Sequence, residues 1–287
     1  MTRQIAILSG KGGAGKTSIT ASLIKLLDSV VAVDADVNAS NLPILLPHRR
    51  ESTQPYFGMD IAQVEHGKCT GCGACLPICK FNAISPTADG EISITDDCEG
   101  CASCAFACPH DAIRMVARQG GAHYLSSMGN GFLIHADLIP GQDNSGKLIT
   151  RIRTEASAVA KQQDIAYIVI DGPPGTSCQA ISSITGTDRI LAVVEESLSG
   201  LSDYRRLAEL INKFSIPHDV LINKAGCDPA IAERIELAAE EFGGRLSGRI
   251  PFDRKIPQAL QNLQSPADMD DYKGILSDVL NRLLEDP

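Results

Sequence analysis

The stretch SGKGGAGKTS, residues 9–18, decides the fold of this chain. It matches the pattern GxxxxGK[ST], in which backbone N–H groups and a helix N-terminus surround phosphate oxygens. Lys16 adds positive charge, and the Thr17 hydroxyl is suited to Mg²⁺. Apolar residues 5–8 and 19–27 supply the flanking strand and helix, so we expect ATP or GTP to bind here with Mg²⁺. The expected contacts are Gly10, Lys11, Gly12, Gly13, Ala14, Gly15, Lys16, Thr17 and Ser18.

Composition places the chain among globular proteins. Its 287 residues are 44% hydrophobic, which is enough for a full core. The formal net charge of −9 disfavours a surface for nucleic acid or anionic membranes, because such surfaces need clustered Lys and Arg. We find no signal-peptide pattern and no run of 18 apolar residues. We therefore expect a cytoplasmic protein that binds neither nucleic acid nor membrane.

Strand and helix patterns alternate along most of the chain. Continuous apolar runs predict buried strands at residues 3–8, 30–33, 132–136, 165–170, 190–194 and 219–222. Helical spacing of apolar residues predicts helices at 15–27, 147–161, 201–214 and 271–284. This order predicts an α/β fold with a mainly parallel, doubly wound sheet formed by residues 1–56 and 119–287. The last helix has an acidic polar side that anionic lipid would repel, so we expect it to dock on the core.

Two of the predicted strands run directly into a carboxylate. Asp34 follows residues 30–33, and Asp171 follows residues 165–170. Because ligands bind at the carboxyl edge of parallel sheets, we expect both aspartates near the phosphate loop. Asp171 fits the Walker B position, where a carboxylate binds Mg²⁺ through water. Asp36 lies two residues beyond Asp34 and has a plainer alternative role, as the cap of the following turn.

Eight of the ten cysteines lie within residues 57–118, where the composition changes and we expect an inserted domain. They form two copies of CxxCxxCxxxC, offset by 29 residues, and this repetition indicates an internal duplication. Iron–sulfur clusters, zinc and disulfides are the competing interpretations, and the spacing favours two [4Fe–4S] clusters. The cysteines are Cys69, Cys72, Cys75 and Cys79 in the first copy and Cys98, Cys101, Cys104 and Cys108 in the second.

The phosphate loop contains a second lysine, Lys11, and so has the form KGGxGKT. Together with DADVNASNL (34–42) and DGPPGTS (171–177), it resembles the MinD/ParA/Mrp superfamily of ATPases. The resemblance implies a homodimer that encloses two ATP molecules. It implies that Lys11 reaches the nucleotide of the partner chain, in the manner of an arginine finger; a solvated loop lysine is the alternative. The implied Mg²⁺ ligands are Thr17, Asp34 and Asp171.

The same resemblance assigns roles in catalysis and in base binding. Asp36 would orient or deprotonate the attacking water, and Asn41 would contact the opposing chain. The implied catalytic residues are Lys11, Lys16, Asp36 and Asp171. The implied adenine contacts are Asn223, Lys224 and Pro251. For Asn223 a helix cap or turn is the plainer alternative.

The cysteine-rich segment resembles the α+β fold of bacterial two-cluster ferredoxins, in which the fourth cysteine of each run ligates the other cluster. One departure from that pattern concerns the residue after the fourth cysteine, which is Lys80 in the first copy and the expected Pro109 in the second. This departure removes no cysteine ligand, and we expect it to alter the reduction potential of the second cluster. By the resemblance, the first cluster is held by Cys69, Cys72, Cys75 and Cys108. The second is held by Cys98, Cys101, Cys104 and Cys79.

Three features lie outside these motifs. The polar loop at residues 140–146 could sense the inserted domain, an interpretation that rests on sequence order alone. Cys178 follows the DGPPGTS segment, and we expect it to be a small buried side chain. A metal site between two chains is the alternative, because the distantly related nitrogenase iron protein holds a cluster with a cysteine in its comparable loop. Cys227 lies in a turn, and we expect it to be inert.

The whole pattern resembles MinD-superfamily ATPases with an inserted ferredoxin domain, and it leaves three functions open. The first is a nucleotide-gated dimer that couples ATP to electron transfer toward a redox partner. The second is an assembly or carrier ATPase that delivers iron–sulfur clusters to an accepting protein. The third is a MinD-like positioning switch in which the clusters are structural.

Overall fold

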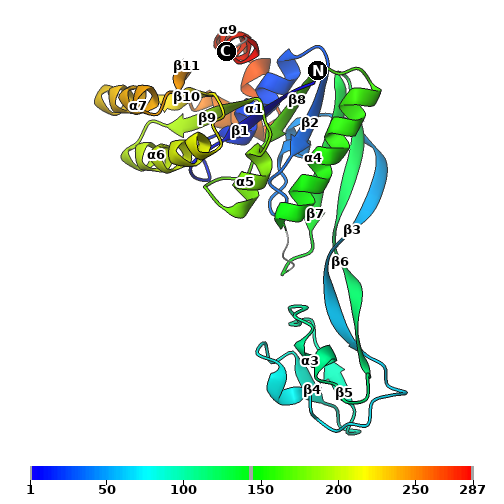
Figure 1. The fold of residues 1–287 in the computed structure, drawn as a ribbon. Coiled ribbons are helices and arrows are strands. Elements are labelled where there is room, and N and C mark those ends of the chain that lie inside the picture. The colour runs from blue at the N-terminus through cyan, green and yellow to red at the C-terminus, as the bar shows by residue number, and fades with distance from the viewer. Residues whose placement is uncertain (1, 142–144, 286–287) are drawn as a thin grey trace. The chain divides into compact units, whose positions relative to one another are not determined.

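A nine-stranded sheet organises the chain in the computed structural model, which describes residues 2–141 and 145–285. In spatial order its strands are β11 (Arg245–Pro251), β10 (His218–Ala225), β9 (Arg189–Glu195), β1 (Arg3–Leu8), β8 (Tyr167–Asp171), β2 (Val30–Asp34), β7 (Gly131–Leu138), β6 (Ile113–Met128) and β3 (His48–Val64). All neighbours from β11 to β7 are parallel, which confirms the prediction of a mainly parallel sheet (Figure 1).

The strands at the centre of this sheet are buried on both faces. Every residue of β2 is buried, and so are the last four residues of β1. Both runs consist almost entirely of Val, Ile, Leu and Ala, which suits parallel strands covered by helices on each side. The carboxyl ends of β2 and β8 meet at one edge, where Asp34 is in register with Asp171.

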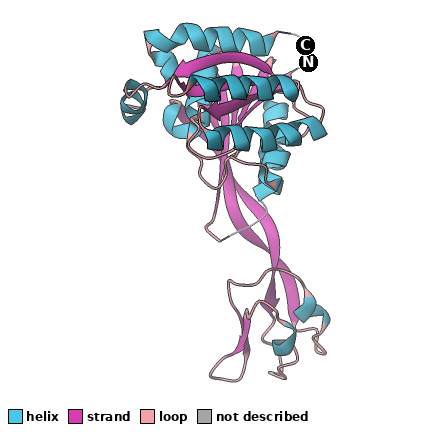
Figure 2. Cartoon of the chain, turned by 90° about the vertical axis from the view of Figure 1, so that its left-hand side faces the viewer, coloured by secondary structure: helices cyan, strands magenta, loops and turns pink. Residues whose placement is uncertain are grey.

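Helices cover both faces of the sheet (Figure 2). One group contains α1 (Lys16–Leu26), α2 (Leu42–Leu45), α8 (Lys255–Gln261) and α9 (Asp270–Leu284). The other contains α4 (Ser145–Gln162), α5 (Cys178–Ile184), α6 (Leu198–Lys213) and α7 (Pro229–Glu241). Within the groups α1 packs on α9, and α4 packs on α5. This is the predicted doubly wound architecture. Among the described residues, no helix combines the length and hydropathy that a membrane span requires.

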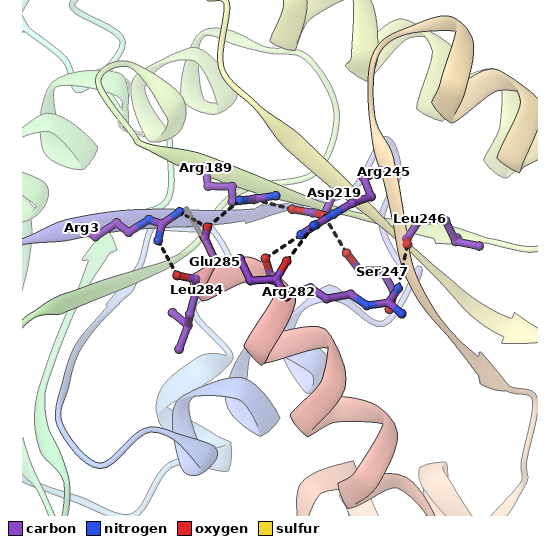
Figure 3. Close-up of polar contacts among 9 residues, drawn as sticks. All are labelled: Arg3, Arg189, Asp219, Arg245, Leu246, Ser247, Arg282, Leu284 and Glu285. Carbon is purple, nitrogen blue, oxygen red and sulfur yellow. Dashed lines mark hydrogen bonds and ion pairs between the residues drawn. The ribbon is translucent and has the colours of Figure 1, made fainter. Parts of the chain in front are cut away.

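The C-terminal helix α9 docks on the core, as its apolar spacing predicts. Basic side chains receive the end of this helix (Figure 3): Arg3 donates to the Leu284 carbonyl at 2.7 Å, and Arg189 donates to the Glu285 carbonyl at 3.0 Å. Guanidinium groups are favourable there because a helix C-terminus carries partial negative charge. The residues of α9 that the core buries are Tyr272, Leu276, Val279, Leu280 and Leu283.

Asp219 is the buried centre of the polar contacts in Figure 3. Its carboxylate accepts hydrogen bonds from Arg189 Nε at 2.5 Å and from Arg245 Nε at 2.8 Å. A third bond comes from Ser247 Oγ at 2.8 Å. Such partners are required because an unpaired charge in the interior is costly. These residues belong to β9, β10 and β11, so the contacts hold three neighbouring strands together.

We expect Ser247→Ala to lower the free energy of unfolding by about 1–3 kcal/mol, because it removes one hydrogen bond from a buried carboxylate. Urea denaturation measures the change. Ser127→Ala is the matched control, since Ser127 donates to the exposed Glu51, and we expect its effect to stay within about 0.5 kcal/mol. Equal effects from the two variants would contradict this account of Asp219.

The described chain divides into two compact units. The first contains residues 2–54, 123–138 and 145–285, and the second contains residues 55–122 and 139–141. Strands β3 and β6 contribute to both units, so the boundaries expected at residues 56 and 118 fall inside these two long strands. Within the second unit β4 (Ile84–Pro86) and β5 (Ile92–Ile94) form an antiparallel pair, with η1 (Leu76–Ile78) and α3 (Ser103–Phe106). Residues 142–144 of the loop expected to sense the inserted domain lie outside the described residues.

Candidate nucleotide site and cysteine sites

The phosphate loop connects β1 to α1 and ends in Gly15, whose backbone is left-handed with φ 92°. A Cβ atom at this position would lie 2.3 Å from the Asn223 side-chain nitrogen, so only glycine fits. The Asn223 amide in turn donates to the Ala14 carbonyl at 2.7 Å. The loop therefore packs directly on the carboxyl end of β10, 209 residues away in sequence.

The Asp171 carboxylate accepts hydrogen bonds from three polar side chains of α1. Lys16 Nζ lies 2.8 Å from its Oδ1 atom, and the Thr17 hydroxyl donates to Oδ2 at 2.7 Å. Thr20 donates a further bond to Oδ1 at 2.8 Å. The Lys16 and Asp171 side chains are both buried, which makes their pairing obligatory. Sequence reasoning missed Thr20, although its position one turn after Lys16 places it on the same side of the helix.

Asp34 lies beside Asp171 across the β2–β8 pair. Burial, and then the neighbouring Asp171, raise the pKa of Asp34 to about 7. Its carboxylate accepts hydrogen bonds from Ser40 Oγ at 2.9 Å and from the Leu42 backbone at 3.0 Å. Two adjacent buried carboxylates and the Thr17 hydroxyl form a donor set that suits Mg²⁺, which prefers oxygen ligands.

A cavity of about 490 Å³ lies along the phosphate loop. Asp36 lines it, and burial raises the pKa of this carboxyl group. Asn41 lines the same cavity. The predicted contacts that the cavity brings together are Gly12, Gly13, Gly15, Lys16, Thr17, Ser18, Asn223, Lys224 and Pro251. Three do not line it, namely Gly10, Lys11 and Ala14. Residues of this cavity that the sequence prediction left out include Asp253, Ile256 and Leu260.

Lys224 stands at a break in the regular backbone. Its φ of 59° is left-handed, and the pairing of β10 with β11 shifts register between Asn223 and Ala225. The Lys224 ammonium donates to the Gly13 carbonyl of the phosphate loop at 2.9 Å. Strained backbone of this kind is held in place by its surroundings and concentrates at functional sites. The cavity therefore has a fixed polar edge at Lys224.

Lys11 points to residues of its own chain. Its ammonium lies 2.8 Å from Glu195 Oε2 and donates to Ser199 Oγ at 2.8 Å. The Lys11 side chain is 31% exposed. It lines a small neighbouring hollow together with Glu195, and that hollow is separate from the nucleotide cavity. No sequence motif contains Glu195, so this contact became visible only in the folded chain.

Comparison with known proteins agrees with this geometry. The sequence model of the family described as the CobQ/CobB/MinD/ParA nucleotide binding domain matches residues 5–266. The chain belongs to this family. An uncharacterised protein of Methanocaldococcus jannaschii is 34% identical, over 90% of this chain and 88% of its own length. With its phosphate loop, buried Lys16 and Walker B carboxylate, this MinD/ParA-family chain is a P-loop ATPase.

Two further similarities extend the comparison. An iron-sulfur cluster carrier protein of Methanocaldococcus jannaschii is 24% identical, over 89% of this chain and 74% of its own length. Among solved structures, the septum site-determining protein MinD complexed with Mg-ADP from Pyrococcus horikoshii has a TM-score of 0.58 at 19% identity. That likeness covers 99% of this chain and 97% of the other, and it supports the fold.

Eight cysteines of this MinD/ParA-family protein line two separate small hollows. Each hollow takes three cysteines from one CxxCxxC run and its fourth from the other run. The first is lined by Cys69, Cys72, Cys75 and Cys108. The second is lined by Cys98, Cys101, Cys104 and Cys79. The eight thiols therefore gather in the same two groups that the resemblance to ferredoxins implies.

The two cysteine runs share one backbone conformation, as an internal duplication requires. Gly71 and Gly100, which are 29 residues apart, have φ angles of 70° and 65°. A Cβ atom would meet the Gly90 carbonyl at 2.6 Å in the first case and the Asp60 carbonyl at 2.2 Å in the second. Glycine is therefore required at both places, where the loop turns between the first two cysteines.

The thiols differ in their surroundings. Burial raises the pKa of Cys75 and of Cys104, whereas hydrogen bonds with Ser103 lower the pKa of the exposed Cys101. Two thiols also accept backbone hydrogen bonds, Cys98 from Ala62 at 3.5 Å and Cys108 from Ala112 at 3.3 Å. Bonds of this type stabilise thiolates. In the part of the chain that the structure describes, no three His, Cys, Asp or Glu side chains approach closely enough to hold a single metal ion.

The two remaining cysteines lie on the surface. Cys178 begins α5 and is exposed, so the expectation of a small buried side chain is wrong. The reason is that the first turn of this short helix faces solvent, and burial begins only at Ala180. Cys227 is exposed too, with its thiol 3.7 Å from the Lys224 carbonyl.

Proposed function

We propose that this protein is a nucleotide-gated dimeric ATPase whose inserted domain holds two [4Fe–4S] clusters and couples ATP to electron transfer. In this proposal residues 57–118 are a ferredoxin-like domain within a P-loop ATPase domain formed by residues 1–56 and 119–287. The observation that carries it is the grouping of eight cysteines in two hollows, each completed by a cysteine from the other run. Exchange of the fourth ligand is what two-cluster ferredoxins use.

The donor set fits iron–sulfur clusters better than it fits zinc. Four thiols line each hollow, and within the described residues no three of them close around one ion. Zinc draws its four ligands to about 2.3 Å and requires such closure. The small buried residues Ala83 and Ala112 lie beside the thiols, one in each hollow. When bound, the two clusters would supply one-electron chemistry at low potential.

The chain connections support a coupling between nucleotide and inserted domain. Asp34 holds the Leu42 backbone, where α2 begins, and the chain enters β3 at His48, three residues after α2 ends. At the end of β7, the strand that follows β6 in the chain, the Leu138 backbone donates to the Val37 carbonyl at 3.3 Å. The entry to the inserted domain and the end of β7 are therefore both attached to the segment that follows the proposed Mg²⁺ carboxylate. Movement of that segment on hydrolysis would act on both.

A second function is favoured by the relatives. Three of them are named iron-sulfur cluster carrier proteins, from Methanocaldococcus jannaschii, Pyrococcus horikoshii and Methanococcus maripaludis, at 24%, 22% and 25% identity. Another is named a cytosolic Fe-S cluster assembly factor, from Emericella nidulans, at 26% identity. A carrier would release its clusters to an accepting protein, whereas an electron-transfer protein would keep them.

A redox titration followed by electron paramagnetic resonance tests the first function. We expect the midpoint potential of at least one cluster to differ between MgATP and MgADP, and we expect Lys16→Ala to abolish that difference. Equal potentials in every nucleotide state would contradict the proposal. Incubation of the ⁵⁵Fe-labelled protein with an apo-ferredoxin then separates the two functions, because transfer of label would favour the carrier.

A further inference from the structure

We propose that Glu195 is a positioning residue that holds the Lys11 ammonium group within its own protomer, and thereby sets how readily two protomers close on ATP. This inference rests on the proposed dimer, in which Lys11 acts on the partner's nucleotide. Glu195 is the last residue of β9, at the edge of the sheet where the nucleotide cavity lies.

The contact between the two side chains is direct. Lys11 Nζ lies 2.8 Å from Glu195 Oε2, and the Ser199 hydroxyl accepts a second hydrogen bond from the same ammonium group at 2.8 Å. Glu195 is 24% exposed, and Lys11 is 31% exposed. Hydrogen bonding from Lys11 and the charge of Lys224 lower the pKa of Glu195, which is therefore ionised at neutral pH. The ammonium group is held by a charge and by a hydroxyl at one place.

The other oxygen of Glu195 faces a second functional lysine. Lys224 Nζ lies 3.5 Å from Glu195 Oε1 and also donates to the Gly13 carbonyl. Lys224 lines the nucleotide cavity, whereas Lys11 does not. One carboxylate is thus shared by a lysine of the cavity and by the lysine that the dimer requires.

The carboxylate and a partner's phosphate compete for the same ammonium group. Lys11 cannot keep its 2.8 Å contact with Glu195 while its ammonium binds phosphate in another chain. A partly exposed ion pair is weak, and a phosphate forms stronger charge-assisted bonds, so the competition favours the partner only when nucleotide is present. Glu195 therefore disfavours closure without nucleotide and lowers the affinity of the closed dimer.

The test compares Glu195→Gln with the parent protein in sedimentation velocity runs at saturating Mg-AMP-PNP. We expect the protein concentration for half-maximal dimer formation to fall about two- to fivefold, because a partly exposed ion pair is lost. Glu241→Gln is the matched control, because Glu241 pairs with Arg205 on the surface at 3.1 Å, and it should leave that concentration unchanged. Unaltered thermal unfolding and ADP affinity would show that Glu195→Gln is folded.

A double-variant cycle assigns the effect to Lys11. We expect Lys11→Ala to weaken dimer formation and to abolish the effect of Glu195→Gln in the double variant. If Lys11→Ala weakens the dimer while Glu195→Gln leaves it unchanged, the role of Glu195 is wrong and the proposed dimer stands. If Glu195→Gln acts equally in both backgrounds, its effect runs through Lys224 and the proposal is overturned. If Lys11→Ala has no effect, the dimer contact itself is wrong.

Discussion

Asp171→Asn is expected to lower ATP hydrolysis at saturating MgATP by on the order of 10²–10³-fold. This carboxylate accepts hydrogen bonds from Lys16, Thr17 and Thr20, and it lies where we expect Mg²⁺ to bind. An amide keeps the shape but supplies no negative charge to the cation, so stabilisation of the developing phosphate charge is lost. Steady-state phosphate release measures the rate.

The same substitution should also destabilise the fold. Lys16 is 7% exposed, and Asp171 is 1% exposed, so the amide leaves a buried ammonium group without its counter-ion. Breaking a buried pair in this way costs about 3–5 kcal/mol of unfolding free energy. We expect pyrophosphate to restore part of this loss, because its oxygens can replace the carboxylate beside Lys16.

Asp188→Asn is the control for both effects. Asp188 accepts a hydrogen bond from the Gln4 backbone at an exposed site, and neither hydrolysis nor stability should change much when it becomes an amide. An Asp171→Asn protein that hydrolyses ATP at half the parental rate or more would contradict the assignment of this residue. So would a destabilisation equal to that of Asp188→Asn.

Two double substitutions of cysteine by serine are expected to differ in the amount of iron that the protein retains. Cys69 and Cys108 line the same hollow, so the double change to serine should remove one cluster and leave about four irons per chain. Cys104 and Cys108 belong to the same sequence run but line different hollows, so their double change should remove both clusters. Iron analysis after anaerobic reconstitution measures the result against about eight irons in the parent protein.

The opposite pattern would show that each run holds a cluster of its own. In that case the Cys104 and Cys108 pair would keep about four irons, and the Cys69 and Cys108 pair would keep almost none. Cys227→Ser is the control and should retain the full iron content, because its thiol lies outside both hollows. Iron retained in full by both double variants would contradict the proposed clusters altogether.

Features that depend on neighbours in the chain could be predicted from the amino-acid sequence. The phosphate loop is such a feature, because its glycines, Lys16 and Thr17 act within one turn between β1 and α1. The buried strands are another, since an unbroken apolar run is read directly from residues such as 30–33. The grouping of the cysteines into two sets of four followed from family resemblance, because spacing places only three thiols of each run together.

The tertiary structure decided the contacts between residues that lie far apart in sequence. Glu195 contacts Lys11 only because β9 and β1 are neighbours in the sheet. No sequence pattern around Glu195 predicts this contact. Asp219 was hidden for the same reason, as its partners begin two other strands. The predicted burial of Cys178 was wrong because seven residues of helix are too few to show which side faces solvent. Local spacing fixes backbone shape, whereas the pairing of charges depends on which strands lie side by side.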